Sequence, residues 1–261
     1  MAYAVAATDA PYFQLRSAGL GKEAARAAAA ADHGEELFPA DEAAGSLLAA
    51  ARSWRTWALV CLYASAFGGM VSLTGWLPTY WREVHGCRPT SAGGLTALHG
   101  VCFAISRVAA GPLSDHVGGG ATMGSALSVT VVGAMLFVRC RSFAADLAGE
   151  VLLAVGSGAA SSAVLKLLPQ EVPQAVGGAA GIVTGLGSFG GFVLTPCLAA
   201  FAHSFGQDGY SQGFAIFAIL AIANVGVVLL LRLSSRQLPT NAYALAAHLD
   251  IGDDDAAAAG K

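Results

Sequence analysis

Charged residues are scarce in this chain, and they form no basic cluster. They make up 12% of the sequence, and 14 lysines and arginines stand against 17 aspartates and glutamates, for a formal net charge of −3. A protein that binds nucleic acid needs a basic patch or stripe to neutralise phosphates. The sequence therefore predicts no nucleic-acid partner.

Long apolar runs, by contrast, fill the middle of the chain. Hydrophobic residues make up 55% of the sequence, and the mean hydropathy is +0.60. A helix needs about 20 apolar residues to cross the hydrocarbon core of a bilayer, and backbone groups in lipid must be hydrogen-bonded internally, which favours helices. Runs that reach or approach this length cover residues 57–80, 92–113, 121–138, 144–168, 176–202 and 213–233. We predict an all-α membrane protein with six transmembrane helices. A soluble helical protein is disfavoured, because so short a chain could not bury six such runs.

These runs divide the chain into three parts. Residues 1–53 form a polar segment with no run of membrane length, residues 54–236 form the six-helix domain, and residues 237–261 form an acidic tail that we expect to be disordered. An even number of spans puts both ends of the domain on one side of the membrane. Basic residues near the span ends are nearly balanced between the two sides, so they leave the orientation open.

The cysteines carry little functional signal. They include no CxxC pair, and no histidines stand at the spacing of metal ligands, so we expect neither a metal site nor a cofactor. Cys61, Cys102 and Cys197 lie in apolar runs, where a thiol usually acts as a small hydrophobic side chain. Cys87 and Cys140 fall in loops on the same side of the membrane, which makes a disulfide between them geometrically conceivable. Because no CxxC pair is present, two free thiols are favoured and the disulfide is the alternative.

Glycines recur every four residues in the fifth apolar run. Gly177, Gly181 and Gly185 form one strip, and Gly187 and Gly191 form a second strip on a neighbouring face. Four-residue spacing leaves a flat surface that another helix backbone can approach closely in a membrane. We therefore expect both strips to be helix-packing faces.

Four of the five charges inside the apolar runs have a simple interpretation. Lys166 and Arg232 lie at the ends of their runs, where their side chains can reach water. Asp146 and Glu150 lie four residues apart on one helix face. This pair is typical of a solvated helix entry, and proton coupling by Glu150 is the alternative.

The fifth charge, Arg107, lies well inside the second run. A charge near the centre of a membrane helix costs about 2.5 to 3.5 kcal/mol on insertion scales, so such residues usually face a cavity or a partner. Four-residue spacing puts Arg107 on one helix stripe with His99, Phe103 and Gly111, which we predict to line a cavity. The alternative is that Arg107 extends along its own helix to the interface near Asp115.

The guanidinium group of Arg107 indicates the kind of cargo. It is a planar, permanently charged fork that suits a carboxylate, a phosphate or another flat oxyanion. An anionic cargo is therefore favoured over a cationic one. His99 is expected to be a hydrogen-bonded interior histidine rather than a proton relay.

Two runs resemble motifs of known transporters. Residues 111–119, GPLSDHVGG, resemble the G-x-L-x-D-x-x-G loop motif of the major facilitator superfamily. In that motif Gly111 and Gly118 would allow a tight turn between helices, and Asp115 would cap and pair near a helix end. Residues 181–192, GIVTGLGSFGGF, resemble the glycine-rich signature in the eleventh helix of the nitrate/nitrite porter family.

Other parts of the chain are similar to the same family. The WRTW sequence at residues 54–57, Tyr63 and residues 106–119 resemble its seventh and eighth helices and the loop that follows. The resemblance covers roughly residues 54–233 and implies half of a major facilitator fold, the second six-helix half of a twelve-helix transporter. Residues 1–53 would then correspond to the central loop.

The resemblance also implies a mechanism. One arginine from each half holds the anion in that family, and Arg107 matches the arginine of the second half, with Tyr63 as a flanking aromatic. The glycine signature would let its helix bend or slide beside the substrate, which adds a set of residues to the predicted site: Gly185, Gly187, Ser188, Gly190 and Gly191. Ser188 stands where many members carry asparagine, which leaves the fine substrate preference open.

The function implied is transport of nitrate or nitrite by alternating access, with no enzyme activity. The expected partners are the anion, the lipid bilayer of the plasma membrane, and either a first-half chain or a second copy of this chain. Two alternatives stay open. One is a carrier of the same superfamily for another organic or inorganic anion, and the other is a half-length membrane protein that packs against a full-length relative without transporting.

Overall fold

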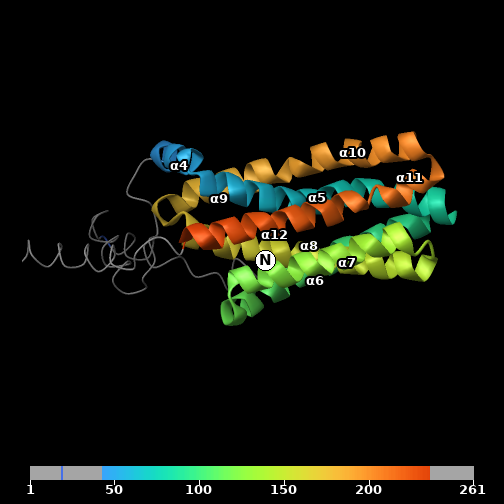
Figure 1. The fold of residues 1–261 in the computed structure, drawn as a ribbon, viewed down its shortest axis with the longest axis horizontal. Helices are drawn as coiled ribbons and strands as arrows, with labels where there is room; N and C mark the ends of the chain where they lie inside the picture. Colours follow the sequence, from blue (N-terminus) through green and yellow to red (C-terminus); the bar gives the residue numbers. More distant parts are fainter. Residues whose placement is uncertain (1–18, 20–42, 236–261) are drawn as a thin grey trace, which may run out of the picture.

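A computed structural model describes Gly19 and residues 43–235 of the chain. The predicted acidic tail and most of the polar N-terminal segment lie outside these residues, so the three-part division of the chain stays a prediction. The long helices run side by side as one elongated bundle (Figure 1). In chain order the elements are α4 (Ala43–Arg52), α5 (Trp54–His85), α6 (Pro89–Val117), α7 (Gly119–Arg139), α8 (Phe143–Glu171), the 3-10 turn η1 (Pro173–Ala175), α9 (Val176–Ser188), α10 (Gly190–Phe205), α11 (Gln207–Gln212) and α12 (Ala215–Ser235).

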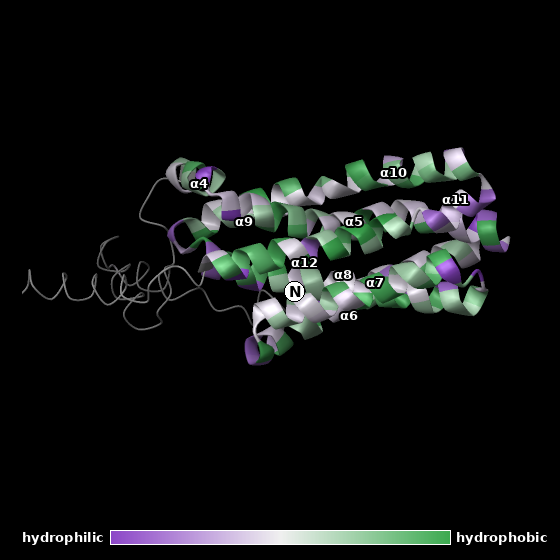
Figure 2. Ribbon diagram, in the orientation of Figure 1, coloured by the Kyte–Doolittle hydropathy of each residue, from purple (hydrophilic) through white to green (hydrophobic). Residues whose placement is uncertain are grey.

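The prediction of six transmembrane helices is confirmed. The described residues contain six helical segments that are long and apolar enough to span a bilayer, with η1, α9 and α10 forming the fifth and α11 and α12 the sixth. Hydrophobic residues extend along the length of the bundle, and hydrophilic residues gather at its two ends (Figure 2). This distribution matches a bundle whose sides face lipid and whose ends face water.

The turn between α6 and α7 is tighter than the loop motif predicts. Helix α6 continues through Gly111 and Asp115 to Val117, and α7 begins at Gly119, so Gly118 alone makes the turn. Its φ of +88° lies where a residue with a Cβ atom would be strained. The expected turn at Gly111 is therefore wrong, because that residue lies within the last turns of a helix.

The fifth span is not one continuous helix. It breaks at Phe189, whose backbone NH donates to Leu186 O at 3.1 Å in a tight turn, and α10 resumes at Gly190. A Cβ atom on Gly190 would overlap the backbone of Ala64 on α5. The break therefore occurs where the chain approaches α5 most closely, a contact that only glycine permits.

Helix α4 lies across one end of the bundle, beside the start of α9 (Figure 1). Ser46 accepts a hydrogen bond from the backbone NH of Gly178 at 3.1 Å, and a Cβ atom on Gly178 would overlap the backbone of Ser46. The sequence predicts no particular structure at this position. The contact depends on a glycine of a distant helix and leaves no local signal in residues 43–52.

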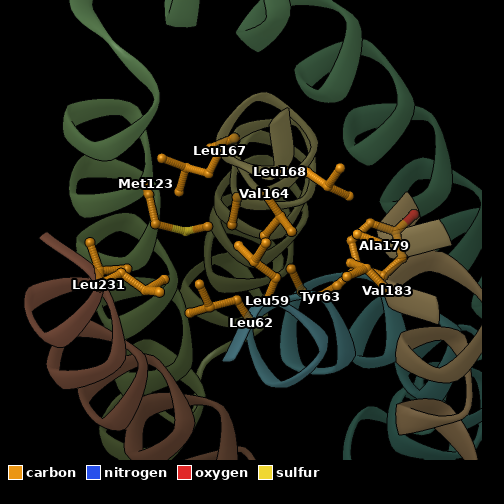
Figure 3. Packing of buried hydrophobic residues seen from close by; sticks show 14 of the residues in the cluster. Leu59, Leu62, Tyr63, Met123, Val164, Leu167, Leu168, Ala179, Val183 and Leu231 are labelled. Carbon is orange, nitrogen blue, oxygen red and sulfur yellow. The ribbon is translucent and has the colours of Figure 1, made fainter. Parts of the chain in front are cut away.

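The half of the bundle nearest α4 is held by an apolar core in which α5 is central. Figure 3 shows Leu59, Leu62 and Tyr63 of α5 beside Val164 of α8 and Val183 of α9. All five side chains are at most 3% exposed. This packing gives the α5 side chains defined positions, and Tyr63 is the one that also carries a polar group.

Candidate functional site

Arg107 lies at the middle of α6 and points toward α5. Its Nη2 donates a hydrogen bond to the Tyr63 hydroxyl at 3.3 Å, and its Cζ lies 5.4 Å from the centroid of the Phe67 ring, within the range of a cation–π interaction. Tyr63 and Phe67 stack with centroids 5.3 Å apart, and Phe103 meets Phe67 edge-on at 6.0 Å. The guanidinium group is therefore partly buried beside a cluster of aromatic rings.

Within the described residues, Arg107 has no ion-pair partner. The ion pairs there join Arg55 to Glu171, His85 to Asp146, Arg141 to Asp208 and Lys166 to Asp115. Asp115 is thus occupied by Lys166, and Arg107 contacts Tyr63 instead. The arrangement disfavours the alternative in which Arg107 extends to the interface near Asp115, and it leaves a charged group with neutral neighbours only.

Two glycines hold this arrangement in place. A Cβ atom on Gly158 of α8 would lie 2.5 Å from the carbonyl oxygen of Phe103 and 3.2 Å from the backbone nitrogen of Arg107. A Cβ atom on Gly187 of α9 would lie 2.7 Å from Cδ1 of Tyr63. The close approach of α8 therefore sets the position of Arg107, and the close approach of α9 sets that of the Tyr63 ring.

The two glycine strips behave differently. Gly187 contacts Tyr63, and Gly191 lies against Gly68 and Val71 of α5, so the second strip is a packing face as predicted. Gly177, Gly181 and Gly185 have no atom of another helix within 4 Å of an added Cβ. The prediction that they form a packing face is therefore wrong for the described bundle, because this side of α9 faces away from the other helices.

Other predicted site residues lie apart from Arg107 or make different contacts. The Ser188 hydroxyl donates to Thr184 O of its own helix at 2.6 Å. Gly111 and Asp115 lie in the last turns of α6, and Gly118 follows at the turn. His99 is fully buried, as expected of an interior histidine, and it approaches the Glu150 backbone, although neither ring nitrogen forms a hydrogen bond within the described residues.

Two cavities of the bundle lie away from the stripe on α6, whose role as a cavity lining stays a prediction. One small cavity of about 20 Å³ lies among α5, α7, α8 and α12 and has Ser65 and Asn224 in its lining. A wider one of about 220 Å³ lies among α6, α7 and α8 and has Ser106 in its lining. Arg107 lines neither, and Phe103 is 4% exposed because it packs inside the bundle.

The two acidic residues of α8 are fully buried, so the prediction of a solvated helix entry is wrong. Asp146 accepts hydrogen bonds from the Tyr80 hydroxyl at 2.7 Å and lies 2.7 Å from His85 Nε2. Glu150 accepts a hydrogen bond from Trp81 Nε1 at 2.8 Å. The C-terminal end of α5 covers both carboxylates with these three side chains, a contact that the α8 sequence alone could not indicate.

Phe67 lies beside Arg107 but is not among the residues predicted for the site. A signal was available, because Phe67 follows Tyr63 by four residues and so shares its face of α5. Cys87 and Cys140 are free thiols, as are the other three cysteines, so the favoured prediction is confirmed and the alternative of a disulfide between them is not found.

Comparison with known proteins gives the chain a family context. Residues 12–193 match the family model described as Major Facilitator Superfamily. The chain is 30% identical over 188 residues to a "Probable nitrate/nitrite antiporter" of Thermus thermophilus, covering 65% of this chain and 42% of that protein. It is 30% identical over 193 residues to a "Probable nitrate/nitrite transporter" of Mycobacterium tuberculosis, covering 70% and 47%. It is also 30% identical over 177 residues to a "Nitrite extrusion protein" of Bacillus subtilis, covering 66% and 43%. The chain thus spans a little less than half the length of these relatives.

Proposed function

The chain belongs to the Major Facilitator Superfamily, a family of membrane transporters rather than enzymes, and from that premise we propose that it binds nitrate or nitrite at Arg107 as the second six-helix half of an alternating-access transporter. The observation that carries the proposal is the guanidinium group of Arg107, which is partly buried and has no carboxylate partner among the described residues. A cation in such surroundings is stabilised by an anionic ligand. The names printed for the three relatives support the choice of nitrate and nitrite.

The neighbours of Arg107 favour a small, flat anion. The Tyr63 hydroxyl lies within hydrogen-bond distance of the guanidinium and can donate its own proton to an anion held there. Phe67, which is partly exposed, offers a flat apolar surface and no further charge, and Phe103 packs edge-on against it. A planar oxyanion with one negative charge can be held by the guanidinium fork while one of its faces contacts the Phe67 ring.

Transport requires further residues on the other side of this site, supplied by a second six-helix unit. Transporters built from repeats place their substrate site at the interface between the repeats, and Arg107 lies on one side of such an interface. The strip of Gly177, Gly181 and Gly185 has no described helix against it and offers a surface for close approach by a first-half helix. The partner is therefore a first six-helix half, with a second copy of this chain as the less favoured alternative.

The test of the anion site is the variant Arg107→Lys, which keeps the charge and removes the fork. Nitrate affinity should fall by about 1 kcal/mol or more, roughly five-fold. The matched control is Arg82→Lys, because Arg82 is an exposed arginine at the end of α5. Affinity is measured by calorimetry on the chain assembled with the first half of one of its relatives. Equal affinity in the Arg107 and Arg82 variants would refute the proposal.

Vesicle uptake separates the remaining alternatives. With the assembled protein, nitrate and nitrite uptake supports the proposal, whereas uptake of carboxylates or phosphate esters alone supports another anion carrier. The purified chain by itself should not transport nitrate as a monomer. If two copies assemble, their arginines repel until an anion bridges them, so nitrate should stabilise the dimer. Robust uptake by a monomer would contradict the assignment as one half of the transporter.

A further inference from the structure

The buried carboxylates of α8 form a second site, far along the chain from Arg107. Asp146 and Glu150 are both 0% exposed. One oxygen of each, Oδ1 of Asp146 and Oε1 of Glu150, is buried without a hydrogen-bond partner among the described residues. An ionised carboxylate in apolar surroundings is costly unless it is paired, and an unpartnered oxygen adds to that cost. At least one of the two groups therefore needs a positively charged ligand.

The two carboxylates are not equivalent. Asp146 has the Tyr80 hydroxyl and the His85 ring at 2.7 Å each, and it lies in the first turn of α8, where a helix N-terminus favours negative charge. Glu150 lies one turn further in and has a single neutral donor, Trp81 Nε1. The His85 ring is thus a potential ion-pair partner for Asp146, whereas Glu150 contacts only the neutral indole NH of Trp81.

Within residues 43–235, no lysine or arginine pairs with Glu150. From α6 comes His99, which is fully buried with both ring nitrogens unpartnered and lies close enough to interact with the Glu150 backbone. From α11 comes Ser211, 3.5 Å from the Tyr80 hydroxyl. Arg141 pairs with Asp208 at 2.6 Å, and both side chains are more than half exposed, so this cation is already neutralised at the surface.

The same cluster extends from Glu150 toward the surface. The His85 side chain is 13% exposed and contacts Asp146 directly. Asp146 lies four residues from Glu150 on the same face of α8. A proton can therefore enter at His85, pass to Asp146 and reach Glu150 without a large opening of the bundle.

We propose that Glu150 is a proton-binding site, reached from water through His85 and Asp146, and that its proton accompanies the anion bound at Arg107. The added proton occupies the unpartnered Oε1 and makes the carboxyl group neutral. One proton and one monovalent anion together leave the net charge of the loaded bundle unchanged. The α6 stripe joins the two sites, because His99 and Arg107 are eight residues apart, about 12 Å along the helix. The link to the anion rests on the proposed function, whereas the proton site does not.

The proton site is tested without any anion by infrared spectroscopy on the purified chain during a pH titration. A buried protonated carboxyl group gives a C=O band that is separate from the band of a carboxylate. We expect this band to be lost in Glu150→Gln and kept in Glu83→Gln, whose parent is an exposed glutamate on α5. Glutamine keeps the size of the side chain and an oxygen for Trp81, and a Trp81→Phe variant should shift the same band. A band that survives in Glu150→Gln, or its absence from the folded wild type at every pH, would overturn the proposal.

The link to transport is tested by counting protons when nitrate binds to the assembled protein. A pH indicator in weak buffer should show uptake of about one proton for each anion in wild type and in Glu83→Gln, and loss of that uptake in Glu150→Gln. Nitrate binding without proton uptake in wild type would overturn the link. If nitrate does not bind at all, the proposed function fails, and the infrared result still decides whether Glu150 binds a proton.

Discussion

Gly187 and Gly185 offer a matched pair for testing how α9 supports the site. Both lie in the same helix, two residues apart. A Cβ atom on Gly187 would lie 2.7 Å from Cδ1 and 3.1 Å from Cβ of Tyr63, whereas one on Gly185 would meet no other helix within 4 Å. Substitution by alanine should therefore disturb the Tyr63 ring in one variant and leave it in place in the other.

The expected magnitude follows from two opposing effects. Alanine is favoured over glycine inside a helix by up to about 1 kcal/mol, and this gain is common to both variants. Overpacking of a filled core costs about 1 to 3 kcal/mol and applies only to Gly187→Ala. The free energy of unfolding of Gly187→Ala should thus be about 1 to 3 kcal/mol lower than that of Gly185→Ala. Displacing the Tyr63 hydroxyl should also weaken nitrate binding by about 0.5 to 1.5 kcal/mol, the net value of a hydrogen bond.

Thermal unfolding of the chain alone in detergent measures the stability difference between the two variants. Nitrate affinity of Gly187→Ala is compared with wild type by calorimetry on the assembled protein, because Gly185 lies on the surface proposed for the first half. A double variant that adds Tyr63→Leu should reduce the cost of Gly187→Ala, because the clash partner is gone. Equal stability of Gly187→Ala and Gly185→Ala, together with wild-type nitrate affinity in Gly187→Ala, would refute the reasoning. Such a result would mean that α9 does not hold Tyr63 against Arg107.

Three further predictions concern the rest of the bundle. Gly158→Ala should separate α6 from α8 and destabilise the protein by about 1 to 3 kcal/mol relative to Gly124→Ala, whose added methyl group meets no other helix, as measured by thermal unfolding. Tyr80→Phe removes a buried donor to Asp146 and should cost about 1 to 3 kcal/mol, and an unchanged unfolding temperature would contradict the buried cluster. Cys140 is an exposed free thiol at the end of a span, so a membrane-impermeant maleimide should reach it from only one face of the membrane. Comparing the labelling of sealed and lysed vesicles shows which face that is, and so establishes the orientation that the sequence left open.

The number and approximate positions of the spans follow from hydropathy, because hydropathy is a property of each residue and can be summed over a stretch of sequence without knowing the fold. The sequence therefore indicated all six spans, and it singled out Arg107 by the cost of a charge in lipid. The boundaries were less well determined. Helix α5 extends from Trp54 to His85, well beyond the apolar run at residues 57–80, because polar and aromatic residues at its end are buried against α8.

The partners of each side chain were decided by tertiary structure. Spacing along a helix puts Asp146 and Glu150 on one face, but it does not say that α5 covers that face with Tyr80, His85 and Trp81. The pair was consequently expected in water, and the structure buries it completely. A helix face is solvated or buried according to which helix lies against it, and that is not a local property.

The glycines of α9 and α10 also show which properties the sequence determines and which depend on tertiary structure. The sequence by itself determined that glycines repeat every four residues and that their helix can be approached closely. Only the tertiary structure decided that Gly187 and Gly191 lie against α5 while Gly177 and Gly181 face away from the bundle. The physical reason is that a missing side chain permits close contact on any face, and the rotation of α9 against its neighbours selects the face on which the contact forms.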